Sequence, residues 1–199
     1  MSAASQAWAQ AKAPVILVVG DSLSAEYGVK RGTGWVSLLQ EKLKAANRPE
    51  IMVNAGISGD TTAGGRSRLP ALLRRHQPSI VIIELGGNDA LRGMPLSTTQ
   101  ANLTAMARAS REAGARVMLV GMEMPPNYGA RYTQQFRDLF KTVAKEEKTA
   151  LVPFLLAGVA DRPDALTLFQ SDRIHPNESA QPILVENVWP TLQEMLSKG

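Results

Sequence analysis

The sequence predicts an α/β fold in which a parallel β-sheet is covered by helices on both faces. Short apolar runs that end near a glycine alternate with longer stretches whose apolar residues recur at helical spacing. Strands that alternate with helices pair in parallel, because each helix carries the chain back across the sheet in a right-handed crossover. The length of 199 residues, without a shift in composition, suits one domain with a sizeable core.

Five short apolar runs are the expected strands: residues 15–19, 51–55, 79–85, 116–120 and 151–154. All but one of the residues in the first run are β-branched, which is typical of a strand buried on both faces. We expect the last strand at an edge of the sheet, because Pro153 has no N–H to donate to a neighbouring strand.

Five longer stretches are the expected helices: residues 35–43, 63–76, 98–113, 132–147 and 179–196. In the first of them, apolar side chains at i, i+3, i+4 and i+8 form a stripe that can face the sheet. His76 ends the second helix, where a cation favourably meets the helix dipole, so we interpret it as a surface residue. The last helix contains Pro190, and we expect a kink or a break there.

The composition argues against several classes of partner and cofactor. The formal net charge of +4 is mild, and even the densest basic stretch, residues 66–75, has its arginines interleaved with Leu and Ala at helical spacing, so we expect no nucleic-acid partner. The chain has no cysteine and only two distant histidines, so we expect no zinc site and no other metal or cofactor. No apolar run approaches the length of about 20 residues that a membrane span needs, so we expect no stable membrane insertion.

Known nucleotide and hydrolase signatures are also missing. The glycine-rich stretch 56–65 lacks the Gly-Lys-Ser/Thr ending of a phosphate-binding loop, and no Gly-x-Gly-x-x-Gly follows the first strand. The stretch around Ser22 lacks the second glycine of the Gly-x-Ser-x-Gly nucleophile elbow. We therefore expect Ser22 on a less strained turn than that elbow, in a site that depends more on loop adjustment.

The first thirteen residues are interpreted as a leader that precedes a domain over residues 14–199. Two Ala-x-Ala patterns, at 7–9 and 11–13, resemble the end of a secretory signal, which would indicate a periplasmic or secreted protein. A disordered leader on a cytoplasmic protein explains the same residues, and both interpretations stay open.

Candidate catalytic residues lie in the loops that follow the strands, which meet at one edge of a parallel sheet. Ser22 follows the first strand directly and is the expected nucleophile. His175 is the candidate base, and Asp172, three residues earlier, can fold over a turn to accept the imidazole Nδ1–H. An ordinary Asp turn beside a solvent-facing histidine explains the last two residues equally well.

Three donors are candidates for an oxyanion hole. They are the backbone N–H of Ser22, the backbone N–H of Gly56 after the second strand, and the side-chain amide of Asn88 after the third. Taken singly, Gly56 and Asn88 are common turn residues. Their position at the same end of the same sheet favours the catalytic interpretation. We interpret the neighbouring Asp21, Asp60 and Asp89 as turn and cap residues and expect Glu84 to be buried with a partner that the sequence does not identify.

Four ordered blocks of this sequence resemble those of the SGNH (GDSL-type) hydrolases. The blocks are Gly20-Asp21-Ser22-Leu23-Ser24, Asn54-Ala55-Gly56-Ile57-Ser58-Gly59-Asp60-Thr61, Gly87-Asn88-Asp89 and Asp172-x-x-His175-Pro176. Stretches 84–93, 125–129, 175–178 and 180–182 are similar to the bacterial thioesterase I/protease I/lysophospholipase L1 subgroup, whose members are also called arylesterases. The resemblance covers nearly the whole chain.

The resemblance implies a three-layer α/β/α sandwich with a flavodoxin-like sheet of about five parallel strands. It also implies Ser22 as nucleophile, His175 as base and Asp172 as its orienting partner, with Ser22, Gly56 and Asn88 forming the oxyanion hole. Many relatives have a glycine where this chain has Arg173. We expect this cation to lower the pKa of Asp172 or to narrow the mouth of the site.

The expected activity is hydrolysis of carboxylic esters and thioesters of acyl or aryl groups, including lysophospholipids and acyl-CoA, through an acyl-enzyme and without a cofactor. The substrate-binding candidates are Leu91, Met94 and Pro126, from loops that also carry Met122 and Met124. Methionine adapts its shape, which favours broad acyl or aryl specificity, although packing beneath the loops explains these residues as well. The alternatives are a carbohydrate O-acetyl esterase and a non-catalytic acyl- or glycan-binding module. We expect a monomer that acts on small molecules.

Overall fold

Five parallel strands form the centre of the fold, in the order β2-β1-β3-β4-β5. The computed structural model describes residues 13–197, so nearly all of the expected leader lies outside the described residues. The strands are β1 Val15–Gly20, β2 Ile51–Asn54, β3 Ile80–Glu84, β4 Arg116–Val120 and β5 Ala150–Val152. This is the flavodoxin-like order, and β5 lies at an edge, immediately before Pro153. The expected flavodoxin-like sheet and the expected edge position of the last strand are both confirmed.

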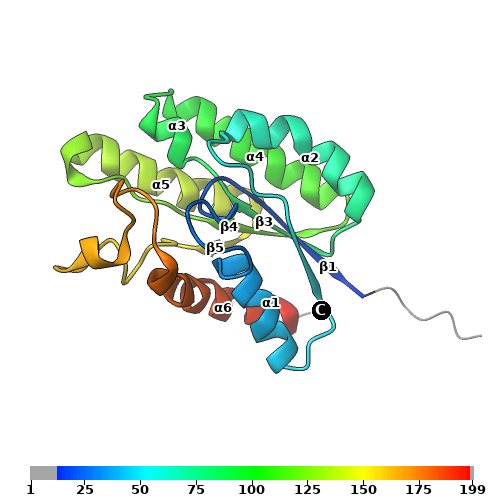
Figure 1. Cartoon of the computed structure of the whole chain (residues 1–199). Helices are drawn as coiled ribbons and strands as arrows, with labels where there is room; N and C mark the ends of the chain where they lie inside the picture. The colour runs from blue at the N-terminus through cyan, green and yellow to red at the C-terminus, as the bar shows by residue number, and fades with distance from the viewer. Residues whose placement is uncertain (1–12, 198–199) are drawn as a thin grey trace, which may run out of the picture.

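Helices cover the two faces of this sheet and complete the three layers. One face carries α1 (Trp35–Ala45) and α6 (Gln181–Ser197), which pack against each other. The other carries α2 (Thr62–His76), α4 (Leu96–Glu112) and α5 (Ala130–Glu147), with α4 between its two neighbours (Figure 1). The shorter helices are α3 (Gly87–Leu91), η1 (Pro126–Tyr128), η2 (Ala165–Leu168) and η3 (Glu178–Ala180). The predicted α/β/α sandwich is confirmed.

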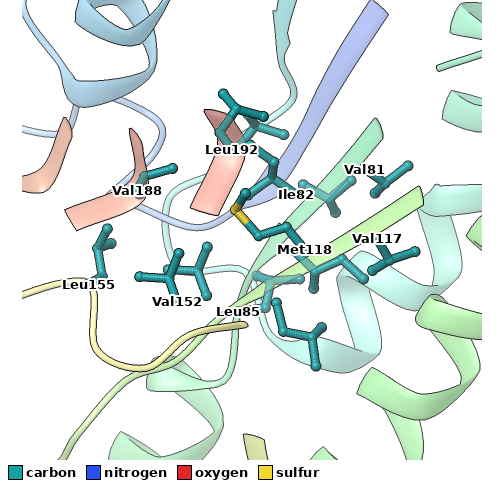
Figure 2. Packing of buried hydrophobic residues seen from close by; sticks show 14 of the residues in the cluster. Val81, Ile82, Leu85, Val117, Met118, Val152, Leu155, Val188 and Leu192 are labelled. Carbon is teal, nitrogen blue, oxygen red and sulfur yellow. The ribbon is translucent and has the colours of Figure 1, made fainter. Parts of the chain in front are cut away.

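The core consists of apolar side chains from both faces of the sheet and from the helices that cover it. Every residue of β1 and β3 is buried, as expected for strands covered on both faces. Ile82 and Met118 lie next to Leu192 of α6 (Figure 2). Burial of a side chain of this size contributes about 1.5–3 kcal/mol. The core therefore holds β1 and β3 rigidly, and the loops that follow them are mounted on a fixed support.

The expected break at Pro190 is wrong, because α6 continues without interruption through this residue to Ser197, whereas the alternative of a kink stays a prediction. Pro70 likewise lies within α2. Both prolines are exposed, on the solvent side of their helices, where water can bind the carbonyl that loses its helical partner. The opposite face of α6 buries Leu184, Val188 and Leu192, and this burial favours the continuous helix. No helix in residues 13–197 combines the length and the apolar character that crossing a bilayer requires.

Candidate active site

The site lies at the point where the strand order reverses, between β1 and β3. These strands are adjacent, and in such a sheet the crevice opens beyond their carboxyl ends. Ser22 follows β1 at the start of a helical turn in which Ala25 N–H donates to the Asp21 carbonyl (2.9 Å). Ser22 does not have a positive φ, in line with a turn less strained than a nucleophile elbow. Asn88 follows β3 in the first turn of α3.

His175 joins the nucleophile loop to the segment that precedes α6. Its Nε2 lies 2.8 Å from Ser22 Oγ, and its Nδ1 lies 2.7 Å from Asp172 Oδ2. The other carboxylate oxygen, Asp172 Oδ1, accepts the backbone N–H groups of Ile174 (2.9 Å) and His175 (3.0 Å). The turn expected at Asp172 therefore exists, and it also carries the histidine. The interpretation of His175 as a solvent-facing residue is wrong, since its ring bonds on both sides.

The Asp172 carboxylate selects the tautomer of His175. Partial burial raises the pKa of Asp172, but the backbone N–H groups of His175 and Ile174 and the His175 ring together lower it to about 2. The side chain is consequently a carboxylate at neutral pH and accepts a proton from Nδ1. Nε2 is then the unprotonated nitrogen, and it accepts the hydrogen bond from the Ser22 hydroxyl.

Arg173 has an unusual backbone conformation. Its φ is +59°, in the left-handed region where glycine is free of strain and an arginine is not. The largest causes of the lowered pKa of Asp172 are the two backbone N–H groups and the histidine ring. That Arg173 also lowers this pKa, or narrows the mouth of the site, stays a prediction. Its exposed side chain lies at the surface beside the site.

The two expected oxyanion donors beyond Ser22 are both held by polar partners. Asn88 Nδ2 donates to Asp21 Oδ2 (3.0 Å), which ties α3 to the nucleophile loop. Gly56 N–H donates to Asn54 Oδ1 (2.9 Å). A Cβ at Gly56 would lie 2.8 Å from Ala25 N, so a glycine is required for this loop to approach the nucleophile loop.

A second glycine of the same loop was not selected from the sequence. Gly59 has a φ of +77°, and its carbonyl accepts a hydrogen bond from Arg92 Nη2 (2.8 Å). Within residues 13–197, its own N–H has no hydrogen-bond partner. Gly59 is therefore a further candidate donor, and the signal that could have found it is its position in a glycine-containing turn between β2 and α2.

Two carboxyl groups, Asp21 and Glu84, are buried directly beneath the nucleophile loop. Glu84 Oε2 accepts from Ser24 Oγ (2.7 Å) and from Asp21 N–H (3.3 Å). Among the described residues Glu84 Oε1 has no hydrogen-bond partner. Burial, and then the charge of Asp21, raise the pKa of Glu84 well above its ordinary value. Burial therefore favours the protonated form of Glu84. Its partners, which the sequence does not identify, are Ser24 and Asp21.

Asp21 is more than the turn residue that the sequence indicates. Its Oδ1 caps the turn by accepting Leu23 N–H (3.0 Å), while its Oδ2 holds Asn88. Burial raises the pKa of Asp21 to about 6, against the opposing effect of these two hydrogen bonds. The nucleophile loop and the Asn88 turn are thus connected through a carboxyl group whose charge is costly to bury.

This pair predicts that the folded protein loses stability as pH rises. The pKa of Asp21 is about 6 in the folded state and about 3.9 in an unfolded chain, so the folded state binds the proton more tightly. The free energy of unfolding then falls between about pH 4 and pH 7, by roughly 3 kcal/mol for Asp21. Glu84 adds to this loss, because its pKa is also raised in the folded state. The variant Glu84→Gln should therefore show a melting temperature that depends less on pH than that of the wild type.

Glu146→Gln is the matched control, because Glu146 is an exposed carboxyl on α5. Its melting temperature should follow the wild type across the same pH range. Parallel curves for Glu84→Gln and the wild type would contradict the raised pKa of the buried Glu84.

The expected substrate-binding residues fall into different environments. Leu91 is exposed at the end of α3, and Met94 is half-buried; the side chain of Pro126 lies outside the described part of the chain. Met122 and Met124 are buried in the core, so for these two the packing interpretation is correct. The cavity that both Ser22 and His175 line has a volume of about 10 Å³, enough for roughly one water molecule. On the Gly56 side, a wider groove of about 600 Å³ runs past Glu26, Arg31 and Asn54.

Comparison with known proteins agrees with this geometry. The model of the GDSL-like lipase/acylhydrolase family matches residues 18–181. Esterase TesA of Pseudomonas aeruginosa is 52% identical over 187 residues, which cover 94% of this chain and 92% of the relative. Thioesterase 1/protease 1/lysophospholipase L1 of Escherichia coli K12 is 39% identical and covers 94% of this chain, with 87% of the relative covered.

A solved structure gives the same result. The psychrotrophic esterase EstA from Pseudoalteromonas, inhibited by monoethylphosphonate, superposes with a TM-score of 0.86 at 39% identity, over 92% of this chain and 98% of the other. The resemblance seen in the sequence blocks is therefore confirmed. The chain belongs to the GDSL-like lipase/acylhydrolase family.

Proposed function

We propose that this enzyme hydrolyses carboxylic esters and thioesters through an acyl-enzyme intermediate on Ser22. The observation that carries the proposal is the unbroken chain of contacts from Ser22 Oγ through His175 to Asp172. A nucleophile, a base and a group that orients the base are the parts that acyl transfer requires. A non-catalytic acyl- or glycan-binding module would have no use for this alignment.

The mechanism follows from the hydrogen bonds. His175 Nε2 takes the proton of Ser22 Oγ as the oxygen attacks the substrate carbonyl, and the imidazolium that forms is stabilised by the Asp172 carboxylate. His175 then protonates the leaving alcohol or thiol, which departs and leaves the acyl group on Ser22. Water enters, gives a proton to Nε2 and releases the acid, and the serine hydroxyl is restored.

The developing oxyanion needs donors, and we assign them to the Ser22 N–H, the Asn88 side-chain amide and the glycine loop after β2. Asn88 bonds to Asp21, which supports this role because the bond fixes the amide plane. Gly56 N–H bonds to Asn54, so Gly56 can serve only if the substrate displaces Asn54. Gly59 needs no such displacement. A site in which one donor must be freed is consistent with the loop adjustment expected from the missing elbow glycine.

Asn88→Ala is expected to lower kcat by about 10²- to 10³-fold, because one oxyanion donor is lost. The same change removes a hydrogen bond from the buried Asp21, so the free energy of unfolding should also fall by about 1–3 kcal/mol. The melting temperature falls with it. The measurement is steady-state hydrolysis of a p-nitrophenyl ester well below the melting temperature.

Asn187→Ala provides the control, since Asn187 Nδ2 donates to the carbonyls of Leu155 and Ala157 (both 2.8 Å), in contacts away from the triad. This variant should lose stability and keep its turnover. An Asn88→Ala variant that behaved like Asn187→Ala would remove Asn88 from the oxyanion hole.

The substrate class that we propose is acyl and aryl esters and thioesters, including lysophospholipids and acyl-CoA. The names of the relatives above, an esterase and a thioesterase 1/protease 1/lysophospholipase L1, support it. The exposed apolar side chain of Leu91 and the half-buried Met94, beside the Asn88 turn, also support acyl contact. The test is kcat/KM on p-nitrophenyl esters of increasing chain length. Activity beyond the acetyl ester supports the proposal, whereas activity confined to acetyl esters favours a carbohydrate O-acetyl esterase.

We further propose that the protein works as a monomer in lipid metabolism, in the bacterial periplasm or outside the cell. The Ala-x-Ala patterns at residues 7–9 and 11–13 support a secreted protein. Fractionation of the native host tests the location, and sedimentation velocity tests the oligomeric state. Recovery in the cytoplasmic fraction, or a stable dimer, would contradict the respective statement.

A further inference from the structure

Most exposed apolar side chains lie at one end of the molecule, in the segments that follow the carboxyl ends of the strands. The structure exposes seven large apolar side chains among its described residues, and six follow the carboxyl end of a strand: Tyr27, Ile57, Leu91, Tyr128, Leu166 and Ile174. We call these six the apolar rim. The seventh, Ile51, lies at the start of β2 and thus at the opposite edge. Scattered exposed residues are ordinary, but this distribution sets one end of the molecule apart.

Several of the loops that carry the rim are joined around Ser22. The Tyr27 ring lies 4.5 Å from the His175 ring, and the Tyr27 carbonyl accepts a hydrogen bond from Gln170 Nε2 (2.8 Å). Arg92 Nη2 bonds to the Gly59 carbonyl (2.8 Å), which connects the loop of Ile57 to the turn of Leu91. Four of the six rim residues, Tyr27, Ile57, Leu91 and Ile174, therefore lie on loops that are linked to one another or to the triad. The other two, Tyr128 and Leu166, follow β4 and β5 at the same end of the strands.

Exposed basic residues lie near the rim. Four on the rim loops (Lys30, Arg31, Arg92 and Arg173), and Arg131 at the start of α5, form no salt bridge within residues 13–197. On the same loops, Asp60 and Asp164 pair with Arg68 and Arg162. Glu26, Asp161 and Glu178 accept only backbone N–H groups or neutral donors among the described residues, and such bonds do not neutralise a carboxylate. Apart from Asp172, which contacts His175, basic residues without a salt bridge therefore outnumber such carboxylates by five to three, so this end of the molecule is apolar with a small excess of positive charge.

We propose that the apolar rim docks the enzyme on an anionic phospholipid surface, with Ser22 facing the lipid. Exposed aromatic and aliphatic side chains flanked by Lys and Arg are what a headgroup layer of negative charge attracts. The cavity that Ser22 and His175 both line is compatible with this occupant, because its volume of about 10 Å³ does not by itself enclose a long acyl chain. In a docked enzyme most of that chain stays in the lipid, and only the ester enters the site. Docking is peripheral and needs no membrane-spanning helix.

The test measures binding without turnover, so that it is independent of the proposed hydrolysis. Ser22→Ala protein is sedimented with vesicles of phosphatidylcholine and phosphatidylglycerol in a ratio of about 7 to 3, and with phosphatidylcholine alone. We expect binding to the mixed vesicles that weakens as salt is added, and much weaker binding to the neutral ones. The double variant Tyr128→Ser/Leu166→Ser should reduce binding about tenfold or more, since two apolar side chains no longer enter the interface.

Ile51→Ser is the matched control, because Ile51 is exposed to a similar degree (49%) at the opposite edge. It should bind vesicles as the parent does. Arg173→Asn should weaken binding only to the anionic vesicles, and asparagine tolerates the left-handed backbone at this position. With Ser22 restored, the double variant should hydrolyse soluble p-nitrophenyl acetate within about twofold of the wild type, as neither residue touches the triad.

Three results would overturn the proposal. The first is no binding of the parent protein to the anionic vesicles. The second is an equal loss in Ile51→Ser and in the double variant, which would reflect general surface hydrophobicity. The third is a large loss of p-nitrophenyl acetate hydrolysis in the double variant with vesicle binding unchanged, which would make the rim part of the substrate site. If the rim instead mediated contact between two copies, the double variant would abolish self-association, and vesicle binding would be absent.

Discussion

Ser22→Ala is expected to lower kcat on p-nitrophenyl esters by about 10⁵-fold or more, with the fold intact. The change removes the oxygen that lies 2.8 Å from His175 Nε2 and leaves the base without a proton to accept. The remaining catalysis would come from substrate binding and the oxyanion donors, which by themselves give about 10³- to 10⁴-fold over water. The release of a burst of p-nitrophenol from the acyl-enzyme should disappear in the variant.

Ser24→Ala is the informative control, because Ser24 lies two residues after Ser22 and has a different role. Its hydroxyl donates to the buried Glu84 (2.7 Å), so its loss should lower stability by about 1–3 kcal/mol. Turnover measured well below the melting temperature should stay within about tenfold of the wild type. A Ser22→Ala variant with wild-type turnover would refute the acyl-enzyme mechanism on Ser22. A Ser24→Ala variant without turnover would indicate Ser24 as the nucleophile instead.

The strands and the position of the nucleophile were predictable because their signals are local. A continuous apolar run, β-branched except at one residue, ends at Gly20 and predicts a buried strand with a loop at its carboxyl end. Ser22 is the first hydroxyl in that loop. Asp172 and His175 are likewise three residues apart, within one turn. Parallel pairing then places all these loops at one edge, which is how Ser22 meets His175 across 153 residues of sequence.

The partners beneath the site were not predictable, because their signals are not local. A glutamate in a buried strand indicates a partner, but only the pairing of β1 with β3 brings Glu84 to Asp21 and Ser24. Asp21 has the sequence of an ordinary turn residue, and its bond to Asn88 depends on how α3 begins. Gly56 satisfied the pattern for an oxyanion donor, but the pattern does not reveal that Asn54 binds its N–H.

Side-chain direction explains the remaining differences. A proline inside a helix predicts a break by its chemistry, but Pro70 and Pro190 both lie on exposed faces, where a lost hydrogen bond is replaced by water. Arg173 next to Asp172 predicts a charge effect by proximity along the chain. The structure shows larger causes of the lowered pKa of Asp172, namely hydrogen bonds within its own turn and from the His175 ring.

Asp172→Asn is expected to lower kcat by about 10⁴-fold at neutral pH while the geometry is kept. The asparagine carbonyl can still accept the N–H groups of Ile174 and His175, so the turn should form. Its NH₂ group would then face His175 Nδ1 and donate to it. The ring would carry its proton on Nε2, which could no longer accept the Ser22 proton, and the charge that stabilises the imidazolium would be gone.

Asp164→Asn separates this effect from a general loss of charge, since Asp164 is an exposed carboxylate on the same segment and, within residues 13–197, forms a salt bridge only with Arg162. An exposed pair of this kind is worth about 0–1 kcal/mol, so activity and melting temperature should stay near the wild-type values. Because the tautomer argument concerns the proton on His175, the two variants should also differ by NMR: the ring Nδ1–H of the wild type, hydrogen-bonded to a carboxylate, should be lost in Asp172→Asn and kept in Asp164→Asn. An Asp172→Asn enzyme with near wild-type kcat would mean that His175 is oriented by the turn alone, and that the carboxylate supplies structure rather than catalysis.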